Sequence, residues 1–335
     1  MKKLLILFSF FLFLTACTSN ESKNRNNFSV DQKESQKNKE NYLSSNTKNE
    51  NVEIPNNISQ YTIEELIQYF EKLGSREVGG KVNALAGQVI AKFWKQLDIL
   101  PYYSRTYYQK FKTEDEITYF LSAGSKYSFS GSAENIVGKI EGMDTSKAVV
   151  LSAHFDTFPG VKGLIDNTSG TVGLMDLSRK INKVYQDKKP PINIIFVAFN
   201  GEEFQLAGSK SFYEQLNKSY KRFYNINLDC IGKKNSALSY GIDNEKSKLL
   251  ASDLKKYLDA NGVKLNNTKY DEQGSSDHAI FWENKRAAMI IGNELPERFV
   301  HTAKDNVSSS IDYEEINKIV RSISQFIINT NGKMY

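Results

Sequence analysis

The stretch that decides the fold runs from Lys147 to Gly170 and reads Lys-Ala-Val-Val-Leu-Ser-Ala-His-Phe-Asp-Thr-Phe-Pro-Gly-Val-Lys-Gly-Leu-Ile-Asp-Asn-Thr-Ser-Gly. Its apolar opening, 148–153, is too short for an ordinary helix and rich in valine, which predicts a buried strand. His154 and Asp156 follow this strand, and Asp166 precedes the residues that resemble the cap and first turn of a helix. Chemistry in open α/β sheets collects at the carboxyl ends of the strands. A histidine and two carboxylates at this place therefore predict a metal site.

The rest of the chain repeats the alternation of strand and helix. Strands are predicted at 102–112, 117–130, 134–140, 148–153, 192–199, 223–229, 237–242 and 287–292. Helices are predicted from Thr62 onward and at 81–97, 171–184, 206–217, 245–260, 277–284 and 312–329. This order predicts an α/β three-layer sandwich, in which helices cover both faces of a central, mostly parallel mixed β-sheet.

The N-terminal part of the chain predicts export and a membrane anchor. Residues 1–16 carry two lysines, a short apolar run and small residues, as a secretory signal peptide does. The sequence Leu-Thr-Ala-Cys that ends at Cys17 resembles the lipobox of bacterial lipoproteins, in which the cysteine is acylated. Residues 17–57 are polar and poor in apolar side chains, which predicts a disordered tether. We therefore expect a chain secreted across the cytoplasmic membrane and lipid-anchored to a bacterial membrane, facing outward, with one folded domain at 58–335.

Composition narrows the function further. The chain has 335 residues and a net charge of +5, of which two charges come from Lys2 and Lys3 in the predicted signal peptide. This excess is too small to indicate a nucleic-acid partner. The two cysteines are Cys17 and Cys230, so a lipidated Cys17 leaves no pair for an internal disulfide. Cys230 itself is expected to be a small core residue.

Further histidines and carboxylates follow the other predicted strands. Five of them could hold two metal ions: His154, Asp166, Glu203, Asp229 and His301. One ion could take His154 and Asp229 and the other Glu203 and His301, with Asp166 shared between both. Imidazole and carboxylate ligands together suit zinc. Two zinc ions per chain could share one water and lower its pKa.

The neighbouring polar residues receive supporting roles. Glu202 cannot point the same way as Glu203, so it could act as the general base that overhangs the water. Asp156 could accept the second ring N–H of His154, and we expect it to be a catalytic residue together with Glu202. His278 is expected to pack or to line the pocket, and Asp305 either orients His301 or caps a turn. The aromatic side chains of Phe158, Phe204 and Trp282 either line a substrate pocket or belong to the core.

Together these motifs resemble the di-zinc aminopeptidases of the leucyl aminopeptidase and aminopeptidase Y type, over roughly residues 75–330. The matching pieces are His154-x-Asp156, Asp166-Asn167-x-Ser169-Gly170, Glu202-Glu203 with Gly208-Ser209, Asn227-Leu228-Asp229, Ser276-Asp277-His278 and His301-Thr302-x-x-Asp305. The resemblance implies a zinc metallopeptidase domain that releases N-terminal amino acids from peptide substrates. It also implies zinc ligation by the five residues above, Glu202 as general base, and a cis peptide bond after Asp166.

One position departs from the family and two other functions stay open. Some members carry a tyrosine before the last histidine ligand, where its hydroxyl stabilises the oxyanion, but here that residue is Val300. A glutaminyl cyclase would share the fold but transfer with a single zinc, which the presence of both His154 and Asp229 disfavours. A solute-binding lipoprotein without catalysis is the alternative from a different class.

Overall fold

The fold is built on a mixed sheet of nine strands. The computed structural model describes residues 52–120, 126–242, 244–266, 276–296 and 299–335, with the backbone alone at 114–120 and 126–127. The predicted signal peptide, Cys17 and nearly all of the predicted tether lie outside these residues. The strands are β1 (Leu100–Pro101), β2 (Tyr108–Phe120), β3 (Lys126–Ile140), β4 (Asp144–His154), β5 (Ile192–Phe199), β6 (Arg222–Leu228), β7 (Leu238–Gly241), β8 (Leu265–Asn266) and β9 (Ala288–Asn293).

The sheet is parallel in its centre and mixed toward its flanks. Its order is β1-β3-β5-β4-β6-β9-β7-β8, and β2 pairs with β3. Strands β5, β4, β6 and β9 are parallel neighbours, so their carboxyl ends lie at one edge of the sheet. The pairs β3–β5 and β7–β9 are antiparallel. This arrangement gathers the residues that follow the four central strands at one place.

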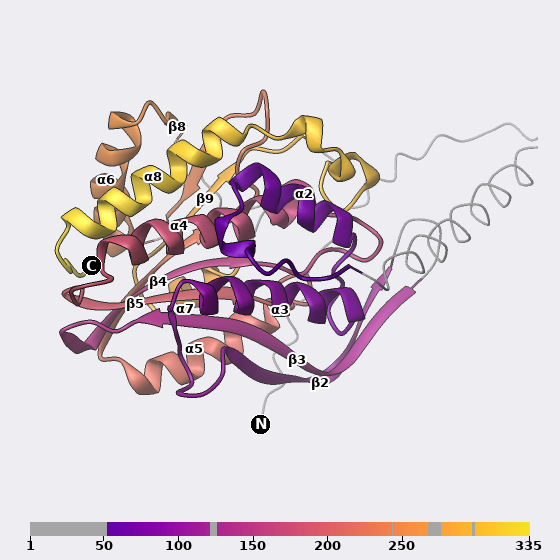
Figure 1. The fold of residues 1–335 in the computed structure, drawn as a ribbon, viewed down its shortest axis with the longest axis horizontal. Helices are drawn as coiled ribbons and strands as arrows, with labels where there is room; N and C mark the ends of the chain where they lie inside the picture. The colour runs from indigo at the N-terminus through magenta and orange to yellow at the C-terminus, as the bar shows by residue number, and fades with distance from the viewer. Residues whose placement is uncertain (1–51, 121–125, 243, 267–275, 297–298) are drawn as a thin grey trace, which may run out of the picture. The chain divides into compact units, whose positions relative to one another are not determined.

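Helices cover both faces of this sheet (Figure 1). The α-helices are α2 (Ile63–Leu73), α3 (Lys81–Gln96), α4 (Gly170–Val184), α5 (Ala207–Ser219), α6 (Glu245–Ala260), α7 (Ala279–Glu283) and α8 (Tyr313–Asn329). Shorter turns are η1 (Ile58–Gln60), η2 (Leu164–Ser169), η3 (Ala303–Asn306) and η4 (Ser308–Ser310). The larger core lies between the sheet and α2, α3, α4, α6 and α8, and the smaller one lies between the sheet and α5 and α7.

Alternation along the central strands explains the three layers. Val149 on β4 belongs to the larger core, whereas Val150 belongs to the smaller one. Every residue of β5 is buried, as expected for a strand with helices on both faces. The prediction of a mixed sheet between two helical layers is therefore confirmed.

Most predicted elements occur, with shifted ends. Thr62 caps α2 in a capping box with Glu65, in which each side chain accepts the other residue's backbone N–H. The predicted strand 117–130 contains the end of β2 and the beginning of β3, and the predicted strand 134–140 continues β3, which pairs with β2 and then with β5, so the predicted break between residues 130 and 134 does not exist. The separation was wrong because the glycine and serines near residue 131 look like a turn in the sequence, but the chain stays extended there.

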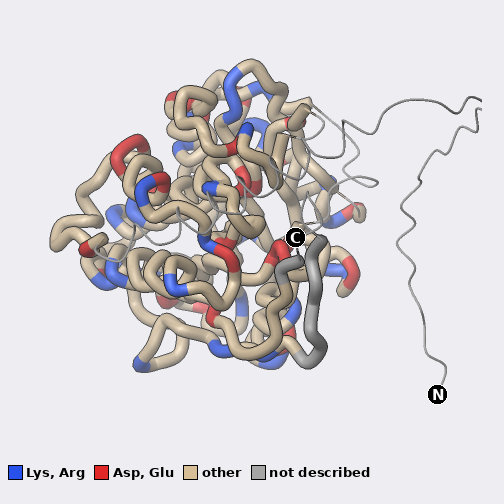
Figure 2. The backbone as a smooth tube through the Cα atoms, turned by 90° about the vertical axis from the view of Figure 1, so that its right-hand side faces the viewer, with Lys and Arg blue, Asp and Glu red and all other residues tan. Residues whose placement is uncertain are grey.

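Basic and acidic residues alternate along the backbone and are spread over the fold without a large region of one sign (Figure 2). Within the part of the chain that the structure describes, no helix is both long and apolar enough to cross a membrane.

Candidate metal centre

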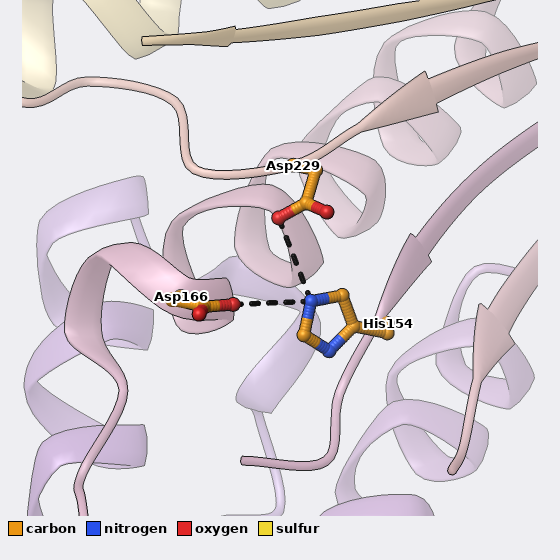
Figure 3. Close-up of side chains that lie close together, drawn as sticks. All are labelled: His154, Asp166 and Asp229. Atoms are coloured by element: carbon orange, nitrogen blue, oxygen red, sulfur yellow. Dashed lines mark ion pairs between the residues drawn. The ribbon is translucent and has the colours of Figure 1, made fainter. Parts of the chain in front are cut away.

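Three of the five candidate ligands lie at or just after the carboxyl ends of the neighbouring strands β4, β5 and β6. His154 is the last residue of β4, and it lies opposite Phe199, the last residue of β5. Glu203 follows β5 after a short turn, and Asp229 follows β6 directly. Figure 3 shows His154 and Asp229 at their strand ends, with Asp166 facing His154 from the start of η2. The parallel centre of the sheet is thus the reason that residues distant in sequence meet.

Two groups of side chains meet at this edge, and Asp166 belongs to both. In the first group, His154 Nε2 lies 3.2 Å from Asp166 Oδ1 and 3.5 Å from Asp229 Oδ1. In the second, His301 Nε2 lies 3.3 Å from Asp166 Oδ2 and 3.1 Å from Glu203 Oε2. Within each group the ligand atoms all lie within 4.8 Å of one another. Asp166 therefore offers one carboxylate oxygen to each group.

The donor atoms of these groups fit zinc. Several of them are buried and have no hydrogen-bond partner among the described residues, namely His154 Nε2, Glu203 Oε1 and Asp229 Oδ1. Buried polar atoms are nearly always satisfied, so atoms left over at one point indicate a missing partner. Imidazole nitrogens and carboxylate oxygens are the donors that zinc takes in catalytic sites. The residues present therefore fit a zinc centre.

The electrostatics of the centre are those of crowded, buried groups. Burial raises the pKa of Glu203 to about 7, and the negative charge of Asp166 adds to this shift. Burial lowers the pKa of His301, but the carboxylates of Asp166 and Glu203 outweigh this effect and raise it to about 11. The pKa of His154 is also raised well above its usual value, because the charges of Glu202 and Asp229 outweigh its burial. A dication would replace these protons, since metal ligands must be deprotonated.

Glu202 and Asp156 lie directly behind the ligands. Burial raises the pKa of Glu202 well above its usual value, and the charges of Glu203, Asp229 and Asp277 act in the same direction. Asp156 Oδ1 and Oδ2 accept the backbone N–H groups of Glu202 and Glu203, at 3.2 and 3.3 Å. The Nδ1 of His154 lies 3.2 Å from the carbonyl oxygen of Asp156 and 3.6 Å from its Oδ1. Asp156 thus holds both the histidine and the glutamate loop, and its backbone as well as its carboxylate takes part.

Asp166 is fixed from two sides. Asp305 accepts the backbone N–H of Ile165 at 2.7 Å and that of Asp166 at 2.9 Å, so it supports Asp166. Of the two roles expected for it, orienting His301 or capping a turn, this contact agrees with capping, because both N–H groups lie in the first turn of η2. The peptide bond between Asp166 and Asn167 is cis, as the family resemblance implies. The Asn167 side chain donates to the carbonyl oxygen of Leu228, which joins η2 to the end of β6.

The other residues singled out in the sequence, His278, Phe158 and Phe204, differ in their surroundings. His278 is fully buried with its ring edge-on to Trp282, and burial lowers its pKa to about 3, so the imidazole is neutral. Phe158 stacks on the ring of His301 with centroids 4.8 Å apart. Phe204 belongs to a small buried cluster, which contradicts a role in a pocket wall.

Two further residues singled out in the sequence, Val300 and Cys230, pack against the larger core. Val300 packs against the larger core and carries no hydroxyl that could stand in for the tyrosine of the family. Cys230 is partly buried against the same core, and its N–H donates to Asn167 Oδ1, as suits a small structural residue.

The structure brings two further groups to the centre: Asp277, which the sequence places in a motif without a role, and Arg76, which the sequence does not indicate. Asp277 is fully buried, and its charge interacts with that of Glu202. Arg76 is fully buried beside the loop between β4 and α4. The spacing of the motifs carried no signal for Arg76, because it lies in the connection between two helices far from any predicted strand end.

Comparison with known proteins agrees with this geometry. Residues 135–327 match the family model described as Peptidase family M28. The chain is 31% identical over 188 residues to "Aminopeptidase YwaD" of Bacillus subtilis, which covers 52% of this chain and 40% of that relative. The chain therefore spans less than half the length of this curated relative.

Solved structures share the fold. A zinc aminopeptidase from Bacillus subtilis, BSAP, superposes with a TM-score of 0.67 at 17% identity, over 84% of this chain and 97% of that one. A glutaminyl cyclase from Bacteroides thetaiotaomicron gives a TM-score of 0.60 at 18% identity, over 83% and 99%. The chain belongs to Peptidase family M28. This membership agrees with the predicted enzyme class, the metallopeptidases.

Proposed function

We propose that this protein is a di-zinc aminopeptidase that hydrolyses the first peptide bond of peptides with a free amino terminus. The observation that carries the proposal is the pair of ligand groups that share Asp166. His154 and Asp229 complete one group, and Glu203 and His301 complete the other. Membership of a peptidase family and the similarity to a relative named as an aminopeptidase support this substrate class.

The residues of the chain divide the work of the reaction. When bound, zinc would polarise the substrate carbonyl and make a water molecule more acidic. Glu202 takes the proton of the attacking water on a carboxylate oxygen and then delivers it to the nitrogen of the leaving amine. A raised pKa suits this role, because it makes the Glu202 carboxylate a stronger base than an exposed one. Asp156 keeps the backbone of Glu202 and Glu203 in place.

The test compares peptides and variants by mass spectrometry. The protein from residue 18 on is incubated with a peptide that has a free N-terminal leucine and with its N-acetylated form, with and without chelator. We expect release of leucine from the free form only, loss of activity with chelator, and recovery with zinc. Cleavage of the acetylated peptide would contradict an aminopeptidase, and loss of ammonia from an N-terminal glutamine peptide without any cleavage would indicate a cyclase.

The role of Glu202 has its own control. Glu202→Gln should lower turnover by about 10²- to 10⁴-fold while the zinc content stays unchanged. Glu214 lies exposed on α5, so Glu214→Gln should leave turnover unchanged. Full activity of Glu202→Gln would contradict its assignment as the general base.

We also propose that Cys17 carries a lipid that holds the domain on the outer side of a bacterial membrane. The lipobox-like sequence before Cys17 and the polar segment after it support this proposal. Labelling of the full chain with an alkyne-bearing fatty acid should mark the wild type and not Cys17→Ser. Equal labelling of both would contradict the anchor.

A further inference from the structure

Arg76 lies in the connection between α2 and α3, and its side chain is fully buried. A buried guanidinium is expensive unless each of its N–H groups finds an acceptor. Here the acceptors are uncharged oxygens, and nearly all of them belong to the loop between β4 and α4. This loop carries Asp156 and the shared ligand Asp166.

The hydrogen bonds of the guanidinium match its five donors. Nε donates to the carbonyl oxygen of Phe155 at 2.8 Å. Nη1 donates to the carbonyl oxygens of Lys162 and Gly74, at 2.9 and 3.3 Å. Nη2 donates to Thr168 Oγ1 at 2.9 Å and to the carbonyl oxygen of Gly163 at 3.5 Å. One side chain thus fixes the start, middle and end of the loop.

The backbone near Arg76 reaches the second ligand loop. The N–H of Arg76 donates to Thr157 Oγ1, and its carbonyl oxygen accepts from Asn83 Nδ2, both at 2.8 Å. Asn83 and Asn200 exchange a pair of side-chain hydrogen bonds of 3.0 and 2.9 Å. Asn200 follows β5 and immediately precedes the Gly201-Glu202-Glu203 turn.

Charge adds to the geometry. Several buried carboxylates surround the ligands, and those of Asp156, Asp305 and Asp166 attract the guanidinium without contacting it. This attraction holds the pKa of Arg76 near 10 despite its burial, so the side chain remains a cation. A buried cation behind the loop offsets the mutual repulsion of these carboxylates.

We propose that Arg76 is a positioning residue of the metal centre. It holds the β4–α4 loop in the shape that sets Asp166 between His154 and His301, so that one carboxylate can serve two ions. The inference rests on the proposed di-zinc function and adds to it a residue that touches neither substrate nor ligand side chain.

The test measures zinc affinity by competition with a chromophoric chelator, on protein shown to be folded by circular dichroism. Arg76→Met should weaken zinc binding by about 10- to 100-fold, as loss of a group that orients ligands commonly does. Arg76→Lys keeps the charge but has three donors instead of five, so it should recover part of the affinity.

A matched control separates positioning from stability. Arg179 lies on α4 and donates to the backbone carbonyls of Ser59 and Tyr61, so Arg179→Met also removes hydrogen bonds to backbone carbonyls, which here are partly buried. This control should lower the melting temperature and leave zinc affinity unchanged. If Arg76→Met does not fold, Thr168→Val removes one acceptor of the guanidinium and should weaken zinc binding several-fold.

The outcomes distinguish the two proposals. If the wild type binds no zinc, the proposed function fails. If the wild type binds two zinc ions and Arg76→Met, or Thr168→Val in its place, binds them equally well, only the role of Arg76 is overturned. An Arg76→Met variant that loses stability but keeps the wild-type zinc affinity would also overturn the role of Arg76, because such a result would show that Arg76 has only a structural role.

Discussion

Asp305 offers a sharp test of how the shared ligand is held, through the variant Asp305→Ala. The residue is fully buried, and its carboxylate accepts the N–H groups of Ile165 and Asp166. Each buried N–H that loses its acceptor costs about 1–3 kcal/mol, so the two together cost about 2–6 kcal/mol. Burial raises the pKa of Asp305 to about 7, so the ionised group is itself penalised in the folded state. We therefore expect Asp305→Ala to lower the free energy of unfolding by about 2–3 kcal/mol at neutral pH, near the lower end of this range.

The assay is urea unfolding of the metal-free protein, followed by a zinc titration of the same variant. Asp312 is the matched control, because its carboxylate also accepts a backbone N–H, that of Glu315 at the start of α8. Asp312→Ala should cost about 1 kcal/mol, the usual value for a lost helix cap, and leave zinc binding intact. Asp305→Ala should also weaken zinc binding by about 10- to 100-fold. The reasoning is refuted if Asp305→Ala costs no more than Asp312→Ala or binds zinc as the wild type does.

Three further predictions concern the same region. The metal-free protein should lose thermal stability as the pH rises from about 5 to about 9. The reason is that the raised pKa values of Glu203 and His301 make the folded state hold protons that the unfolded state releases. Melting temperatures that rise or stay level over this range would contradict this. His278→Leu should keep both zinc ions and change stability by less than about 1 kcal/mol, because the ring is neutral and its nitrogens have no hydrogen-bond partner among the described residues; metal analysis that shows one zinc would identify it as a ligand. Gly170→Ala should reduce the yield of folded protein, because a Cβ there would collide with Asn167 Oδ1 and the carbonyl oxygen of Leu228, and a normal melting curve would count against this packing.

The parts of the site that follow strands could be predicted from the sequence. The apolar runs 148–153 and 192–199 mark β4 and β5, and parallel strands place their carboxyl ends together. His154, Asp229 and the pair Glu202-Glu203 could be named for this reason, and the family resemblance implies that Glu203 is the ligand of that pair. His301 also follows a predicted strand, but several residues separate it from the end of β9, and the motif that it forms with Asp305 adds to the family resemblance.

The supporting residues could not be predicted, because their contacts depend on three-dimensional packing. Arg76 lies in the connection between α2 and α3, and Asn83 lies in the first turn of α3. No periodicity in the sequence indicates that either residue lies near the metal centre. For Asp305 the sequence leaves two roles open, orienting His301 or capping a turn, and it does not indicate which backbone the carboxylate contacts. The structure shows that it acts on Asp166, because η3 packs against η2. Sequence separation is a poor guide to which backbone N–H a buried carboxylate will accept.

The measurement that tests the central claim most directly is the zinc content of the purified protein by inductively coupled plasma mass spectrometry. The account predicts two zinc ions per chain in the wild type, and loss of both in Asp166→Ala because its two oxygens serve both ligand groups. Asp229→Ala should lose one ion only. A wild type with a single zinc, or an Asp166→Ala variant that retains two, would contradict the shared-ligand centre.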